Sequence, residues 1–212
     1  TADMSEFHLH ILVIGSGVIG VSTAYILRRR GMDVTVVESA GGPGRQTSFA
    51  NAALLTPSLA DPWNAPGIGR ALIKSIGRED APMLLRLRAL PSLIGWGIEF
   101  LRSSSEERFL DNFRKNIALA RYNLDVLHAL QTDVKLQFDH AARGTLRVFR
   151  DDEALRSATQ SLARFRETLG LPARQLDRDQ LIETEPALLP IVAELVGAIH
   201  YPGDECGDAH QY

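Results

Sequence analysis

The sequence is poor in cysteine and has no excess of basic charge. Cys206 is the only cysteine among 212 residues, so no disulfide can form within the chain, and we expect a reducing, cytoplasmic compartment. The chain has 23 lysine and arginine residues against 26 aspartate and glutamate residues, which gives a net charge of -3. Such a balance offers no broad basic face, and it excludes nucleic acid as an expected partner.

Long apolar runs are also missing. The most apolar region, residues 81–101, is interrupted by Arg86, Arg88 and Glu99, so its longest uncharged run is about half of the ~20 residues that a membrane span needs. The N-terminus has no basic stretch followed by a long apolar core, so no secretory signal is expected. Residues 81–101 predict a pair of buried helices; the alternative is a surface at the membrane interface, with Trp96 at its boundary.

The motifs of several enzyme classes are absent. The sequence contains no GxSxG, no HExxH and no P-loop lysine, which excludes the hydrolase and kinase classes that depend on them. Potential metal ligands crowd between His200 and His210, but their spacing fits none of the usual zinc patterns. We expect an acidic turn there, no metal site, and a structural role for His128 on the preceding helix.

What the sequence does contain is a glycine-rich turn in a complete setting. Gly15, Gly17 and Gly20 form a GxGxxG motif between an apolar strand-like run, residues 10–14, and a helix-like run, residues 18–30. The first glycine allows a sharp turn, the second lets the backbone approach a pyrophosphate, and the third lets the helix pack closely on the strand. Free N–H groups at the start of the helix then face the phosphates.

An acidic residue closes the next apolar segment. After Gly31, residues 33–38 are typical of a second parallel strand that ends in Glu38. A carboxylate at this position would accept hydrogen bonds from an adenosine ribose and would repel a 2'-phosphate, which disfavours NADP and leaves FAD and NAD. The sequence therefore predicts a Rossmann-like dinucleotide-binding domain of the α/β class.

The segment that follows favours the longer cofactor. Residues 39–67 are small, polar and rich in glycine and proline, as in a loop that wraps a ligand rather than a further strand and helix. Motifs along the whole chain resemble those of the bacterial D-amino-acid dehydrogenases, flavoproteins of the D-amino-acid oxidase superfamily. The matching stretches are residues 13–21, 47–52, 62–67, 144–149, 185–188 and 202–208.

The resemblance implies FAD as the cofactor and assigns residues to it. The ADP portion would lie on Gly15, Ser16, Gly17, Val18, Gly20 and Glu38, and Ser48, Ala50 and Asn51 would lie along the pyrophosphate and the flavin. The residues alone leave another interpretation open, in which Ser48 and Asn51 form hydrogen bonds within their own loop. Ala53 departs from the family pattern, which has glycine at this position.

The resemblance also implies an activity. Family members oxidise D-amino acids to 2-oxo acids and ammonia and pass electrons to a quinone or another respiratory-chain acceptor, often at the cytoplasmic face of the inner membrane. They continue well beyond the position of Tyr212, and the part that follows carries the substrate-binding arginine and tyrosine. No catalytic residue is therefore predicted here, and a missing C-terminal half or a partner subunit is expected. A non-catalytic FAD-binding subunit and an oxygen-using oxidase remain alternatives.

The rest of the pattern predicts a second, α+β domain with an antiparallel sheet that covers the substrate side of the flavin. We expect the FAD-binding domain to start in residues 1–60, the substrate domain to occupy residues 61–203, and residues 204–212 to return to the first domain. The expected elements are a long helix at 105–131, an antiparallel hairpin of strands at 134–138 and 144–149, a helix at 151–169, a capped short helix from Asp177 to before Pro186, and a strand at 195–201.

Overall fold

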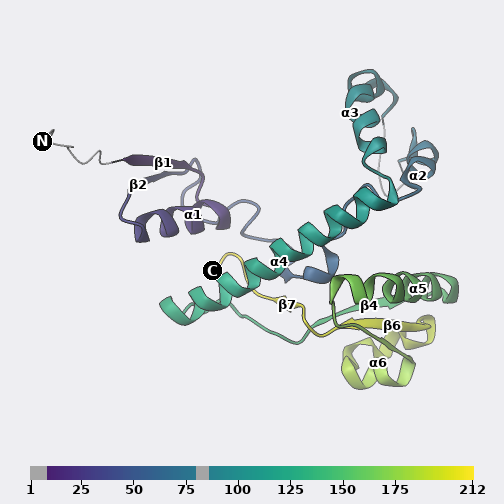
Figure 1. The fold of residues 1–212 in the computed structure, drawn as a ribbon. Coiled ribbons are helices and arrows are strands. Elements are labelled where there is room, and N and C mark those ends of the chain that lie inside the picture. Colours follow the sequence, from purple (N-terminus) through teal and green to yellow (C-terminus); the bar gives the residue numbers. More distant parts are fainter. Residues whose placement is uncertain (1–8, 80–85) are drawn as a thin grey trace, which may run out of the picture. The chain divides into compact units, whose positions relative to one another are not determined.

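A computed structural model describes residues 9–79 and 86–212 of the chain (Figure 1). The chain divides into two compact units, each formed by segments that are distant in the sequence. The first unit comprises Thr1–Leu55, His128–Arg143 and Glu205–Tyr212, and the second comprises Thr56–Leu127 and Gly144–Asp204.

The first unit begins with the expected strand, helix and strand. These are β1 (His10–Ile14), α1 (Val18–Arg29) and β2 (Asp33–Val37), drawn in purple in Figure 1. The two strands pair in parallel, with His10 opposite Asp33 and Ile14 opposite Val37. Gly31 adopts a φ of +83°, the left-handed conformation that ends many helices and that glycine adopts at little cost. The predicted βαβ start is confirmed.

This parallel pair leaves much of its apolar surface exposed. Leu12, Ile14 and Val37 expose 57%, 84% and 49% of their surface. Parallel strands are ordinarily covered by helices on both faces, and in the described residues α1 is the helix that packs against β1 and β2. A single βαβ unit therefore cannot bury its own sheet, as its sequence indicates.

The remainder of the first unit ties three distant segments together. The short strand β3 (Leu54–Leu55) pairs antiparallel with β7 (Glu205–Cys206), and Ala141 bridges to Cys206. The N–H of Asp208 donates to the carbonyl of Phe138 at 2.6 Å. Residues 53–55, 138–141 and 205–208 thus form one hydrogen-bonded scaffold.

The second unit contains the predicted antiparallel sheet. Its strand order is β4 (Thr145–Phe149), β6 (Gly197–Tyr201) and β5 (Arg174–Leu176), and every residue of the central β6 is buried. Helix α5 (Asp152–Leu169) and helix α6 (Arg178–Thr184) pack on this sheet, and a 3-10 helix, η3 (Pro186–Glu194), follows α6. The predicted cap of α6 is confirmed by reciprocal hydrogen bonds between Asp177 and Gln180.

Helices dominate the other half of the second unit. They are α2 (Ile68–Ser75), α3 (Leu90–Arg102) and α4 (Glu106–Val134), with 3-10 turns η1 (Pro57–Leu59) and η2 (Leu87–Ala89). The part of α4 in this unit, up to Leu127, buries one stripe of side chains at spacings of three, four and seven: Phe109, Phe113, Ile117, Leu124 and Leu127. This burial confirms the long amphipathic helix.

The region expected to form two buried helices differs from that expectation. Residues 81–85 lie outside the described residues, and α3, the helix found next to them, exposes 62% of Ile94, 57% of Trp96 and 47% of Ile98. Among the described residues, no helix combines the length and the apolar character required to cross a membrane.

The predicted hairpin of residues 134–138 and 144–149 is wrong. Val134 is the last residue of α4, and Lys135 then ends the helix with a φ of +54°. Strand β4 pairs instead with β6, from Thr145 opposite Tyr201 to Phe149 opposite Gly197. A five-residue alternation of apolar and polar side chains fits the end of a helix as well as a strand, and tertiary pairing decided between them.

Candidate nucleotide-binding site

The glycine-rich loop has the close approach that its sequence requires. Gly15 adopts a φ of +95°, and its N–H donates to the carbonyl of Val37 at 2.7 Å. A Cβ atom on Gly20 would lie 1.9 Å from the carbonyl oxygen of Gly15, so α1 packs against the loop too closely for any side chain there. These two glycines set the turn and bring the start of α1 beside the end of β1.

The carboxylate at the end of β2 is fixed beside this loop. One oxygen of Glu38 accepts from the N–H of Ser16 at 2.7 Å and from its hydroxyl at 2.8 Å, and the other accepts from the N–H of Ala40 at 2.9 Å. The backbone N–H groups of Ala40 and Ser16, with the Ser16 hydroxyl, lower the pKa of Glu38 to about 2. The side chain is therefore an anion throughout the physiological pH range.

Ser48 caps the start of α1 from a distant segment. Its Oγ accepts from the N–H of Val18 at 3.0 Å, and a Cβ on Gly17 would approach that Oγ to 3.2 Å. Asn51, in contrast, bonds locally, because its Oδ1 accepts from the N–H of Ala53 at 2.8 Å. The interpretation of local hydrogen bonds within the loop therefore holds for Asn51, which forms the bond expected of a turn residue. It does not hold for Ser48, which bonds to the start of α1.

An open cavity lies at the glycine-rich turn, beside the start of α1. Within the described residues, the backbone N–H groups of Gly17 and Ile19 have no acceptor, as is ordinary for the first turn of a helix. The cavity measures about 430 Å³ and is lined by residues of three segments: Ile14, Gly15 and Gly17; Val37, Glu38 and Ser39; and residues 44–48. Its polar groups include the Glu38 carboxylate and the side chains of Ser39, Arg45, Gln46, Thr47 and Ser48.

A second cavity adjoins the same segment. It measures about 270 Å³ and is lined by residues 48–51, Ala53, Asp139 and residues 207–209. Ser48 lines both cavities. Together they offer an extended site within the first unit, of the kind that a dinucleotide requires.

The structure brings the sequence-predicted residues to this region in different capacities. Gly15, Gly17, Glu38 and Ser48 line the first cavity, and Ser48, Ala50 and Asn51 line the second. Ser16 and Val18 act through their hydrogen bonds to Glu38 and Ser48, and Gly20 acts through its packing.

Other lining residues escaped the sequence analysis. Gly44, whose N–H donates to the carbonyl of Ser16 at 2.9 Å, follows a glycine-rich stretch that could have indicated it. Asp139 joins the second cavity from a segment that no local pattern marks. Gly207 also lines it and lies in the stretch expected to return to the FAD-binding domain, although that expectation gave it no role at the cofactor.

Comparison with known proteins identifies the family of the chain. The family model of the FAD dependent oxidoreductases, known as DAO, matches residues 10–212, so the chain belongs to this family and its cofactor is FAD.

Solved structures share the fold. Glycine oxidase from Bacillus cereus ATCC 14579 is 19% identical with a TM-score of 0.54, and the match covers 94% of this chain and 40% of that one. L-alpha-glycerophosphate oxidase from Mycoplasma pneumoniae with FAD bound is 20% identical with a TM-score of 0.53, and the match covers 94% of this chain and 39% of that one. For iminodiacetate oxidase from Chelativorans sp. BNC1 the values are 19%, 0.53, 94% and 41%. The chain thus spans about 40% of the length of the structures it matches.

Proposed function

We propose that the first unit binds the ADP portion of FAD and that the complete protein oxidises D-amino acids. The observation that carries the first part is the cavity over the GxGxxG turn, with the N–H groups of α1 on one side and the anchored Glu38 carboxylate on the other. An anionic pyrophosphate fits the helix N-terminus, and ribose hydroxyls fit the carboxylate.

Each residue has a distinct part in this proposal. Gly17 leaves room for a phosphate at the first turn of α1, and the N–H groups of Gly17 and Ile19 donate to it. Glu38 accepts from the ribose hydroxyls while it keeps its bonds to the chain, because each carboxylate oxygen can accept more than one hydrogen bond. Its negative charge disfavours a 2'-phosphate. Ala50 and Asn51, in the second cavity, lie along the pyrophosphate and the flavin.

The reaction follows from the resemblance to the D-amino-acid dehydrogenases. FAD, when bound, supplies the acceptor for a hydride from the substrate Cα. With loss of that hydride from Cα and of one proton from its ammonium group to water, the amino acid becomes an imino acid. Water would hydrolyse the imino acid to a 2-oxo acid and ammonia, and a quinone or another respiratory-chain carrier would take up the electrons. The glycine oxidase and the iminodiacetate oxidase among the similar structures support an amine substrate.

The substrate pocket requires more than these residues. We propose that a further segment or partner subunit completes the FAD-binding domain begun by residues 1–60 and 204–212. The substrate domain expected at residues 61–203 would then be formed without residues 128–143, which belong to the first unit. The exposed apolar side chains of Leu12, Ile14 and Val37 support this view, because further strands and helices would cover them. That segment would also supply the groups that hold the substrate carboxylate.

A membrane contact forms a separate part of the proposal. Helix α3 exposes Ile94, Trp96 and Ile98 and ends in Arg102, a combination that suits the interface of an anionic bilayer at the cytoplasmic face. Co-sedimentation with anionic vesicles tests this, and Trp96→Ser should reduce it. Equal sedimentation of both proteins would contradict the contact.

An anaerobic absorbance titration tests the proposed reaction. Purified protein, with its intact mass determined, receives a mixture of D-amino acids, and a matched sample receives the L-amino acids. Bleaching of the flavin bands by the D-mixture alone supports the dehydrogenase, and the mass shows which chain supplies the rest of the pocket. Bleaching by the L-mixture alone contradicts it.

Other outcomes favour the alternatives. Bound FAD that neither mixture bleaches favours an FAD-binding part without turnover. Rapid reoxidation of bleached flavin on admission of air favours an oxidase.

A further inference from the structure

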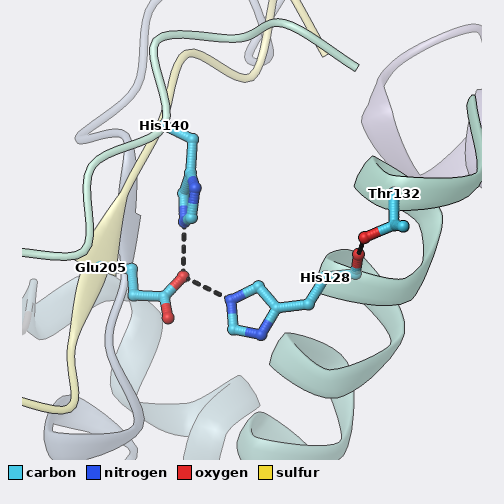
Figure 2. A network of polar contacts seen from close by, with 4 residues as sticks. All are labelled: His128, Thr132, His140 and Glu205. Atoms are coloured by element: carbon cyan, nitrogen blue, oxygen red, sulfur yellow. Dashed lines mark hydrogen bonds and ion pairs between the residues drawn. The ribbon is translucent and has the colours of Figure 1, made fainter. Parts of the chain in front are cut away.

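Two histidines and a glutamate of the first unit converge on one point. His128 lies near the end of α4, His140 lies in the segment that follows, and Glu205 begins β7. The Nε2 atoms of His128 and His140 lie 2.9 Å and 2.6 Å from the same carboxylate oxygen, Oε2 of Glu205 (Figure 2). The three potential ligand atoms all lie within 4.8 Å of one another.

The backbone holds this cluster in place. Ala141 and Cys206, the residues after His140 and Glu205, exchange two backbone hydrogen bonds of 2.9 Å. Glu205 is also paired with Leu55 of β3. The ring of His140 stacks on that of Phe138 at 5.3 Å between centroids. Two of the three side chains therefore have fixed positions, and the third comes from a helix.

The three side chains of the cluster differ in how far they are buried. The side chains of Glu205 and His140 expose 10% and 17% of their surface, and that of His128 exposes 46%. Within the described residues, no hydrogen bond reaches the second carboxylate oxygen of Glu205, Oε1. Glu205 and His140 are thus largely shielded from water, Oε1 of Glu205 is available to a ligand, and the cluster is open to water on the side of His128.

We propose that His128, His140 and Glu205 form a binding site for a divalent transition-metal ion, with Zn²⁺ as the first choice. Two imidazole nitrogens and one carboxylate oxygen suit zinc, and three protein ligands with water in the fourth position is a common zinc arrangement. The sequence predicts no metal site because the spacing within residues 200–210 is unsuitable. In the structure, Glu205 is the one residue of that stretch in the cluster, and His128 and His140 come from other segments.

The observed spacing is close to what an ion requires. Zinc ligands lie about 2.0–2.2 Å from the metal, so two ligands of a tetrahedral ion are separated by roughly 3.3 Å. The present Nε2 to Oε2 distances of 2.9 Å and 2.6 Å reflect hydrogen bonds. An increase of less than about 1 Å in each of these distances, or use of Oε1, would give the Nε2 and carboxylate atoms the spacing of a coordination site. Exposed His128 can supply this movement.

Calorimetric titration with ZnCl2 tests the proposal. The protein is purified with its FAD, treated with a chelator and dialysed, then compared with His128→Gln, His140→Gln and Glu205→Gln. We expect one ion per chain for the unaltered protein, and binding at least about tenfold weaker in each variant, since even loss of an outer partner costs 10–100-fold. Titration with CoCl2 should give the visible bands of a tetrahedral ion.

The controls separate this site from incidental binding. His10→Gln removes another histidine of the same unit, one that contacts Thr35 on the exposed face of β1 and β2, and should leave zinc binding unchanged. His128→Gln replaces a half-exposed helical residue, so its flavin spectrum and circular dichroism should match those of the unaltered protein. Absence of binding, or equal affinity in all four variants, would overturn the proposal. The three groups would then form a hydrogen-bonded cluster only.

Discussion

Substitution of Gly20 by alanine probes the contact on which the nucleotide site depends. The added Cβ would lie 1.9 Å from the carbonyl oxygen of Gly15. Real Cβ atoms essentially never come within 3.0 Å of such an atom, so the loop and α1 must separate by at least about 1.1 Å. Overpacking of this kind costs about 3 kcal/mol. The same movement takes the N–H groups at the start of α1 away from the phosphates. FAD binding should therefore weaken by about 10–100-fold, which corresponds to the loss of one hydrogen bond to a charged group.

Gly17→Ala provides the matched control. Its Cβ would meet the Oγ of Ser48 at 3.2 Å, and a side chain can give way where a backbone carbonyl cannot. The φ of Gly17 is -69°, which alanine adopts freely. We expect a loss of stability below about 1 kcal/mol but clearly weaker FAD binding, because the methyl group occupies the space of a phosphate.

Urea denaturation and quenching of FAD fluorescence measure the two effects separately. Gly20→Ala should lose both stability and affinity, whereas Gly17→Ala should lose mainly affinity. A Gly20→Ala protein with unaltered stability and FAD affinity would refute the reasoning.

Three further predictions concern individual residues. Ala53→Gly should raise the free energy of unfolding by about 0.5–1 kcal/mol, because Ala53 has a φ of +54°; a lower melting temperature would argue against this. The pKa of Glu38 is about 2 in the fold against 4.5 ordinarily, so its stabilising effect is complete above pH 4.5 and is lost as the pH falls through 2. Denaturation of Glu38→Gln and the unaltered protein should therefore differ by a constant amount from pH 5 to 7 and converge below; a gap that persists at pH 2 would contradict this. Asp204, 1% exposed, accepts from the N–H of Ser58 at 3.1 Å and the hydroxyl of Thr145 at 2.5 Å, so Asp204→Ala should cost about 3 kcal/mol or more and Asp204→Asn less. Chemical denaturation that gives both variants the stability of the unaltered protein would count against a structural role for this carboxylate.

Local patterns predicted the elements that are themselves local. The βαβ start was predictable because an apolar strand, a glycine turn, a helix and a second strand follow one another without a break. The cap of α6 was predictable because Asp177 and Gln180 are three residues apart. Strands β5 and β7 were missed because three and two residues show no periodicity.

The candidate site divides in the same way. Gly15, Gly17 and Glu38 stand in one continuous motif, so the sequence alone marks them. Asp139 and Gly207 reach the second cavity only through the backbone ladder that joins residues 53–55, 138–141 and 205–208. Pairings between segments so far apart depend on tertiary structure, and no spacing rule in one sequence predicts them.

Competition for FAD is the most direct test of the central claim. In this proposal the chain holds the ADP portion of the cofactor at the GxGxxG turn and Glu38. ADP should therefore displace FAD from the protein in a fluorescence titration, whereas FMN, which lacks the adenosine part, should not at the same concentration. Displacement by FMN but not by ADP would contradict the account.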